Sequence, residues 1–435
     1  MDPQLAGIVS IVLLFLLLAM RVPVYLVMGV LGVGGMWVLL GAKTAMQAAG
    51  LIPYSAVASY QFAVMPLFVL MGHFVYHTGF TTDVYRSARL WIGRIPGGLA
   101  HATVIAGAAF AAASGSSFAA CATLAKVTIP EMTAHGIDRK MAFGVVAATG
   151  TLAQMIPPSV LMVLYGIIAE QSIGKLLIAG LIPGLVAAAN YMILIYIRVK
   201  RHPELAPLLE ERPSWKERLF SLKSSWGIVT IFVFVMGGIY AGVFTPTEAG
   251  GVGACGTFVM ALALKKLNFN TLKNTLYDVS KTTGMILIII ACAFIFGRFL
   301  ALSRLPVMLS DFLVNLEIPR LGILIAIMVM YIIMGSFLDM LATMFITLPI
   351  ILPAVTKLGY DPIWFGVLIV HLFEVALITP PFGLNLFVLK ATLPDANLNE
   401  VIWGIFPFFL ADLVTLAIYI AFPQLALWLP SLMGA

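Results

Sequence analysis

The chain has 435 residues, of which 61% are hydrophobic and only 10% are charged, and its formal net charge is +6. Soluble domains average roughly 45–50% apolar and about 25% charged residues, so this composition excludes a soluble globular protein and indicates a polytopic membrane protein. The basic residues are scattered through short loops, which argues against a nucleic-acid-binding surface and makes their placement a guide to topology.

Residues 1–96 predict three membrane spans and an interfacial helix, which together form the first scaffold part. Apolar stretches at about 4–20, 23–41 and 60–78 are each long enough to cross a bilayer. The segment TTDVYRSARLWIGR at 81–94 mixes charges with aromatic side chains, which is typical of a helix lying along the membrane surface. Placing this segment in the cytoplasm puts the amino terminus on the periplasmic side.

Residues 97–197 predict the first transport part, because their apolar segments are interrupted twice. The stretch 97–132 is too long for one span and contains SGSS, so we expect a re-entrant hairpin that enters and leaves from the cytoplasm. A span at about 141–169 follows, broken near Gly150 and at Pro157-Pro158, and a span at about 176–197 completes the part. Free backbone groups at such breaks must line a cavity or bind something.

The polar stretch 198–225 is the predicted cytoplasmic linker between two halves. Beyond it, residues 226–318 predict a second scaffold part, with spans at about 226–243, 249–264 and 276–297 and an interfacial segment at 304–317. Residues 319–435 predict the second transport part. Its hairpin at 319–356 breaks at MGSFLD, its span at about 362–391 breaks at ITPPFGLN, and the last span covers about 400–421.

The two halves therefore contain the same order of elements, and an odd number of crossings separates equivalent ones. We expect an all-α membrane protein of two inverted repeats, with about 11 spans, two re-entrant helical hairpins and both termini in the periplasm. Paired interrupted helices in corresponding positions of two repeats are the best pointer in a sequence to a transporter binding site.

The residue types at the breaks suit the coordination of a hard cation such as sodium. Gly and Ser at a hairpin tip free backbone carbonyls and supply small hydroxyls, and we expect the first tip to face an unwound segment at Gly150 and Thr151. The predicted sodium ligands are Ser114, Gly115, Ser116, Ser117, Gly150, Thr151, Gly335, Ser336, Asp339, Thr379, Gly383 and Asn385. The predicted substrate contacts are Ser117, Pro157, Pro158, Thr379, Pro380 and Asn385. The alternative is that Gly and Ser only permit close helix packing.

The acidic residues of the second half are open to two interpretations each. Asp339 at membrane depth should have a cation partner, unless it caps the second arm of its hairpin through backbone N–H groups. Glu374 could assist a cation or carry a proton, or it could make an ordinary hydrogen bond between helices. His371 and Glu374 lack the second His of a zinc motif, and His73 and His77 are expected to be packed or interfacial.

Several motifs in order resemble the large membrane subunit of tripartite ATP-independent periplasmic (TRAP) transporters over nearly the whole chain. These are SGSS before an IPEM-type hairpin end, GTL…IPPS…YG, AEQSIGKLLIAGLIPG at 169–184, GSFLD, and ITPPFGLNLFV. The pattern departs at Ala153-Gln154-Met155, where a smaller or more aliphatic run is expected.

The resemblance implies sodium-coupled import of a small organic anion, such as a dicarboxylate, a keto acid or a sialic acid, by an elevator mechanism in the bacterial inner membrane. It also implies two partners, a small four-span membrane subunit and a periplasmic substrate-binding protein. We expect no enzymatic activity and no cofactor besides coupling sodium ions, and the chain has no GxxxxGK[ST] loop through which ATP could drive it directly.

Three other classes remain open from the sequence. A channel would use similar hairpins but would not need two half-sites. An intramembrane enzyme would have to use Asp339 with Glu374, the only conceivable carboxylate pair. A stand-alone sodium/anion symporter of similar architecture, which needs no binding protein, is the nearest alternative.

Overall fold

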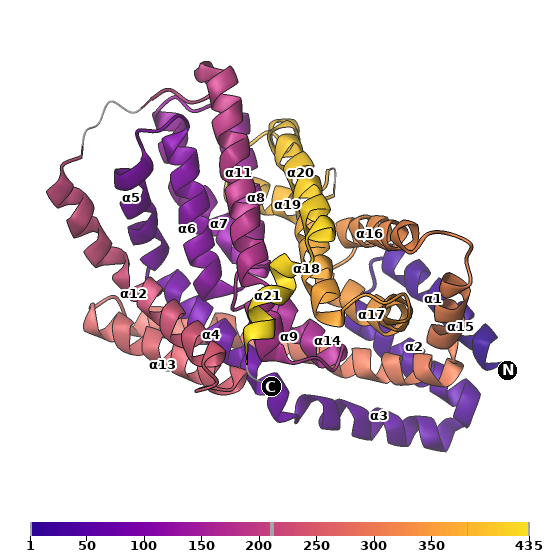
Figure 1. Cartoon of the computed structure of the whole chain (residues 1–435). Coiled ribbons are helices and arrows are strands. Elements are labelled where there is room, and N and C mark those ends of the chain that lie inside the picture. The colour runs from indigo at the N-terminus through magenta and orange to yellow at the C-terminus, as the bar shows by residue number, and fades with distance from the viewer. Residues whose placement is uncertain (1, 209–212, 381, 434–435) are drawn as a thin grey trace.

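The computed structural model describes residues 2–208, 213–380 and 382–433, and these residues form helices without any β-strand (Figure 1). The predicted all-α fold is confirmed. The first scaffold part holds α1 (Pro3–Ala19), α2 (Val24–Leu40), α3 (Ala42–Val57), a 3-10 turn (Tyr60–Ala63), α4 (Val64–His77) and α5 (Phe80–Ile92). The second holds α12 (Trp215–Tyr240), α13 (Pro246–Ala263), α14 (Phe269–Ser303) and α15 (Leu305–Val314).

Each predicted transport part consists of a helical hairpin, an interrupted span and the helices that follow that span. In the first half these are α6 (Gly98–Ser114), α7 (Ser117–Ala134), α8 (Arg139–Thr151), a 3-10 turn (Leu152–Gln154), α9 (Val160–Ile168), α10 (Ile173–Ala179) and α11 (Leu181–Arg201). In the second half they are α16 (Arg320–Phe337), α17 (Met340–Lys357), α18 (Pro362–Ile378), α19 (Leu384–Thr392), α20 (Leu398–Ala421) and α21 (Gln424–Leu432).

The packing of the helices is reciprocal between the halves. Helix α2 packs on α14 as α13 packs on α4. The contacts of the hairpins with these helices differ, because the first arm α6 packs on α4 whereas the second arm α17 packs on α14. The second helix of each hairpin contacts the interrupted span of the other half: α7 packs on α19, and α17 packs on α9. In Figure 1, α6, α7, α11 and α20 run roughly side by side, while α2, α13 and α14 lie across their lower ends. This reciprocity is the packing expected of two inverted repeats.

Two parts of the predicted chain map differ from the structure. Helix α3 was not predicted, and it packs along α2 and α14. The linker is shorter than 198–225, because α11 continues to Arg201 and α12 begins at Trp215 behind a capping box of Ser214 and Glu217.

The predicted number of about 11 spans is not confirmed. Among the described residues, five helices are long and apolar enough to cross a bilayer, or up to seven if each of two bent helix pairs forms one span. Helices α1, α2 and α18 have 17 residues each and fall just short of that length, and both interrupted spans divide into shorter helices.

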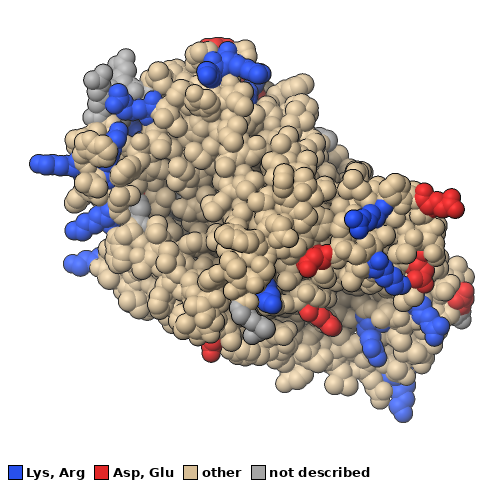
Figure 2. Space-filling model, viewed as in Figure 1, with Lys and Arg blue, Asp and Glu red and all other residues tan. Residues whose placement is uncertain are grey.

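The surface of the protein is largely apolar, as expected for a protein exposed to lipid. In the face shown in Figure 2, charged side chains lie along the left edge, at the top and over the lower right part, and a broad uncharged area lies between them. Large apolar side chains such as Trp37, Phe234 and Trp403 are more than half exposed, which is costly in water but suits a lipid environment. Helices α8 and α18 are instead buried along nearly their whole length. The interrupted helices therefore occupy the centre of the molecule.

Each scaffold part is joined to a short arm helix through a single residue in the left-handed region. Gly79 (φ 72°) precedes α5, and Arg304 (φ 56°) precedes α15. Each arm also forms an ion pair with the second helix of its own hairpin: Arg89 of α5 pairs with Glu131, and Asp311 of α15 pairs with Lys357 at 2.8 Å. The arms thus connect the scaffold to both hairpins.

Candidate functional site

The tip of the first hairpin is a tight reversal that requires a glycine. Gly115 has φ +58°, and a Cβ atom there would lie 2.7 Å from the carbonyl oxygen of Pro158. Ser116 then starts α7, because its hydroxyl accepts a hydrogen bond from the backbone N–H of Ala119 at 3.4 Å. The tip therefore packs directly against the break of the first interrupted span. Ser114 and Ser116 lie on either side of Gly115.

The break of the first interrupted span lies later than the sequence predicted. Gly150 and Thr151 belong to α8 and are not unwound, and the Thr151 hydroxyl donates a hydrogen bond to the carbonyl of Ala148 at 2.7 Å. The chain leaves the helical conformation only at 155–159, a segment that contains Pro157 and Pro158. The two prolines remove backbone donors and so prevent the helix from continuing.

The second hairpin breaks at Leu338 and Asp339. Gly335 and Ser336 are still helical, and the Ser336 hydroxyl donates to the carbonyl of Ile332 at 2.6 Å. Asp339 is the N-cap of α17: its Oδ2 atom accepts hydrogen bonds from Leu341 N at 3.0 Å and from the next residue's N–H at 3.4 Å. The capping alternative for Asp339 is thus observed, although a cap does not exclude a second role for the same carboxylate.

The second interrupted span breaks between α18 and α19. The Thr379 hydroxyl donates to the carbonyl of Val375 at 2.7 Å, Pro380 follows, and Gly383 starts α19. The other proline of this break, Pro381, lies outside the described residues.

Asn385, in the first turn of α19, connects the two halves of the protein. Its side chain is fully buried, and its Nδ2 atom donates to the Ser117 hydroxyl and to the carbonyl of Ala147, both at 3.1 Å. Ser117 therefore faces Asn385 of the other half, and not Gly150 and Thr151 as the sequence predicted. The first hairpin is paired crosswise with the second interrupted span.

Both hairpin tips open into one cavity of about 350 Å³. The first tip contributes Ser114, Gly115 and Ser116, and the second contributes Asp339 with the two residues that follow it. Gln154, at the first break, also lines the cavity, and α4 and α14 of the scaffold form the opposite wall. The cavity thus lies between the scaffold parts and the hairpins.

The other predicted site residues do not line this cavity. They are Ser117, Gly150, Thr151, Pro157, Pro158, Gly335, Ser336, Thr379, Pro380, Gly383 and Asn385. The sequence analysis did not place Gln154 in the site. Its signal was present, because Gln154 is where the TRAP-like pattern departs from the expected aliphatic run.

The first turns of three helices also reach the cavity. Phe118 and Ala119 come from α7, Val160 and Leu161 from α9, and Met340 and Leu341 from α17. Helix N-termini carry a partial positive charge, which favours an anion, and at α17 the Asp339 carboxylate already accepts hydrogen bonds from the first turn. None of the described residues that line the cavity is Lys or Arg, so these helix ends are its main electropositive groups apart from a bound cation.

Four fully buried polar side chains form a cluster in the core: Tyr191, His371, Glu374 and Asp412. In α18, the His371 Nδ1 atom is 2.6 Å from Glu374 Oε2, so Glu374 has a hydrogen-bond partner within its own helix. Asp412 of α20 has its Oδ1 atom 4.0 Å from His371 Nε2 and accepts a hydrogen bond from Tyr191 OH of α11 at 2.7 Å. The sequence analysis missed Tyr191 and Asp412. An isolated carboxylate in the apolar run FFLADLVTLAIY was the available signal for Asp412.

Comparison with known proteins places this geometry in context. Residues 11–425 match the family described as "Tripartite ATP-independent periplasmic transporter, DctM component". The chain is 35% identical to the C4-dicarboxylate TRAP transporter large permease protein DctM of Pseudomonas aeruginosa, over 92% of this chain and 93% of that protein. It is 30% identical to the sialic acid TRAP transporter large permease protein SiaM of Vibrio cholerae, over 86% and 87% of the two chains.

Two further comparisons cover most of the chain. The 2,3-diketo-L-gulonate TRAP transporter large permease protein YiaN of Escherichia coli is 31% identical over 84% of this chain and 86% of that protein. The crystal structure of the Alcanivorax borkumensis YdaH transporter has a TM-score of 0.59 at 14% identity and covers 89% of this chain and 90% of that chain. At that identity the likeness supports the fold alone.

Proposed function

Because the chain belongs to the DctM component family of tripartite ATP-independent periplasmic transporters, we propose that it forms the membrane pathway that imports a small organic acid anion. Members of this family are large transporter permeases of the bacterial inner membrane and not enzymes. The observation that carries the proposal is the single cavity on which both hairpin tips, the first break and three helix N-termini converge.

We propose a carboxylate as the group recognised in the cavity. A volume of about 350 Å³ fits a small organic acid, and helix N-termini can bind a carboxylate through backbone N–H groups. The relatives are named for C4-dicarboxylate, sialic acid and 2,3-diketo-L-gulonate, all of which carry a carboxylate. These names support the class of substrate for this chain and leave the individual acid to experiment.

We propose sodium coupling because of the charge of the cavity. Asp339 brings a carboxylate to the place where the anion binds, and two negative charges in a site of low dielectric repel each other. A cation bound beside Asp339, coordinated by oxygens of the hairpin tips, removes that repulsion. We therefore propose that sodium must bind before or with the substrate, which couples the two.

We propose that the two hairpins and the two interrupted spans move together past the scaffold, as an elevator. The cavity lies on the boundary between these two groups of helices, and the arms α5 and α15 connect them. Each net positive charge that enters with the substrate contributes about 2.3 kcal/mol per 100 mV of membrane potential.

The test is uptake of labelled organic acids into proteoliposomes that contain this chain and a small four-span subunit. Uptake should require a sodium gradient and a periplasmic substrate-binding protein. Unchanged uptake after the sodium gradient is dissipated would remove sodium coupling from the proposal. Equal uptake without the binding protein would favour the stand-alone symporter instead.

A further inference from the structure

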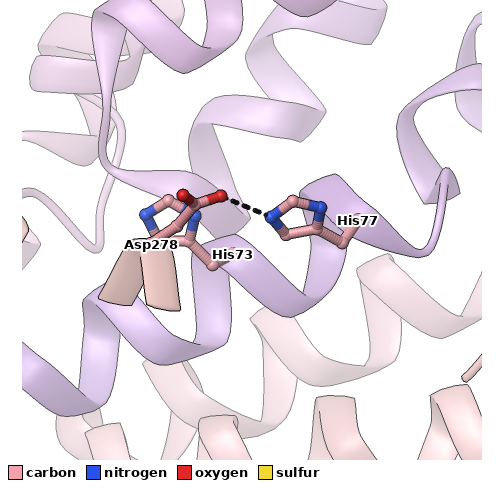
Figure 3. Close-up of side chains that lie close together, drawn as sticks. All are labelled: His73, His77 and Asp278. Atoms are coloured by element: carbon pink, nitrogen blue, oxygen red, sulfur yellow. Dashed lines mark hydrogen bonds and ion pairs between the residues drawn. The ribbon is translucent and has the colours of Figure 1, made fainter. Parts of the chain in front are cut away.

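Two histidines of the scaffold and one aspartate from the other half lie together at the edge of the cavity. His73 and His77 are one turn apart on α4, so both imidazoles project from the same face of the helix. Asp278 comes from α14, which packs against α4. Figure 3 shows the carboxylate of Asp278 between the two rings, with His77 Nε2 2.8 Å from Asp278 Oδ2.

The three side chains are close enough to share one ion. One ligand atom from each lies within 4.8 Å of the other two. Ligands at about 2.0–2.1 Å from a tetrahedral zinc ion are roughly 3.3 Å apart, so small side-chain rotations would complete the site. All three residues are partly exposed, with exposed side-chain fractions of 17% for His77 and 39% for Asp278, which leaves a path for an ion to enter.

An ion pair between His77 and Asp278 does not account for the whole cluster. The Nδ1 atom of His73 is buried and has no hydrogen-bond partner among the described residues. The rings of His73 and His77 are stacked, with centroids 6.1 Å apart and planes at 22°, and each ring has a nitrogen atom within 4.8 Å of the other ligand atoms. Two imidazoles and one carboxylate are a ligand set that suits zinc, cobalt and nickel.

We propose that His73, His77 and Asp278 bind one divalent transition-metal ion, such as Zn²⁺, which joins α4 of the first repeat to α14 of the second. Three protein ligands leave a fourth coordination position open to water or another donor. Because His73 also lines the cavity, the ion would sit in the wall that faces the hairpin tips. The site is separate from the predicted sodium ligands and does not depend on the transport proposal.

The experiment uses the full chain with its small subunit, purified, freed of metal with a chelator and titrated with Zn²⁺ by calorimetry. We expect one ion per chain and a rise in the thermal unfolding temperature on addition of Zn²⁺. His77→Gln and Asp278→Asn should each weaken Zn²⁺ binding by about tenfold or more, since each removes one of three ligands. His135→Gln, which changes a histidine outside the cluster, should leave Zn²⁺ binding unchanged.

A ligand exchange keeps the test decisive if one variant is unstable. His77→Cys replaces an imidazole with a thiolate, which is also a zinc ligand, so Zn²⁺ binding should be retained and Co²⁺ should give a thiolate charge-transfer absorption. The absence of Zn²⁺ binding to the unmodified protein would overturn the proposal. So would Zn²⁺ binding that His77→Gln and Asp278→Asn leave unchanged, because the ion would then be held elsewhere.

Discussion

Substitution of Asp339 can separate a helix cap from a sodium ligand, because asparagine is as good an N-cap as aspartate but has no charge. In Asp339→Asn the side-chain oxygen can still accept hydrogen bonds from the first turn of α17, so the free energy of unfolding should change by less than about 0.5 kcal/mol. Asp339→Ala removes the cap as well and should cost about 1 kcal/mol of stability. Transport by the two variants should nevertheless be impaired to a similar degree.

The size of the transport defect can be worked from the charge. Two unit charges 4 Å apart attract by about 4 kcal/mol at an effective dielectric constant of about 20. Coordination by tip carbonyls and by water offsets part of this loss, and we expect a net loss of about 1.4–2.8 kcal/mol, which raises the half-saturating sodium concentration about ten- to a hundredfold. The assay is the sodium dependence of initial uptake in proteoliposomes at fixed substrate and binding-protein concentrations.

Asp361→Asn is the matched control for this prediction. Asp361 caps α18 in the same way, with Oδ1 accepting from Ile363 N at 2.7 Å and Trp364 N at 3.1 Å, but it does not line the cavity. Its variant should keep normal sodium dependence. If Asp339→Asn also keeps normal sodium dependence, the reasoning is refuted and Asp339 is a cap alone.

The remaining predictions test the packing around the site. A double-mutant cycle of Ser117→Ala and Asn385→Ala should give a coupling energy of about 1 kcal/mol in thermal or denaturant unfolding, because the two side chains share a buried hydrogen bond. A coupling energy near zero would contradict the contact between the two halves. Gly115→Ala should destabilise the protein by about 2 kcal/mol or more, because φ is +58° and a backbone carbonyl oxygen lies 2.7 Å from the added Cβ. Gly34→Ala is the control: no atom lies within 4 Å of the added Cβ there, so this change should be neutral or stabilising in the same measurement. The backbone N–H at the start of α12 lowers the pKa of Glu217 below its usual 4.5, so its stabilising effect is present above that pH and is lost as the pH falls through the lowered value. The difference in unfolding temperature between the wild type and Glu217→Gln should therefore be present above pH 4.5 and shrink as the pH is lowered below it; a constant difference would show that the charge is not involved.

The sequence predicted the fold well where the signal was local. Glycine, serine and proline act on the backbone within a few residues, so the hairpin at Gly115 and the break at Pro157-Pro158 could be read directly. Predicted ends were less accurate: Gly150 and Gly335 remain helical, because the neighbouring residues continue the backbone hydrogen bonds through them.

Contacts between distant segments could not be predicted in this way. Ser117 and Asn385 are 268 positions apart, and inverted repeats permit either pairing within a half or pairing across halves. Only the packing of α7 on α19 decides between them. The same holds for Tyr191 and Asp412, whose meeting depends on how α11 and α20 lie against each other.

The crosswise pairing has a consequence for how such a chain can be divided. The hairpin of each half contacts the interrupted span of the other half as well as that of its own, so the two halves share part of their core. A fragment that ends in the linker would expose the faces of α7 and α9 that its partner normally covers, and we would expect it to be degraded when produced alone. Two separately produced halves could still interlock, because the packing of α7 on α19 and of α17 on α9 joins them directly.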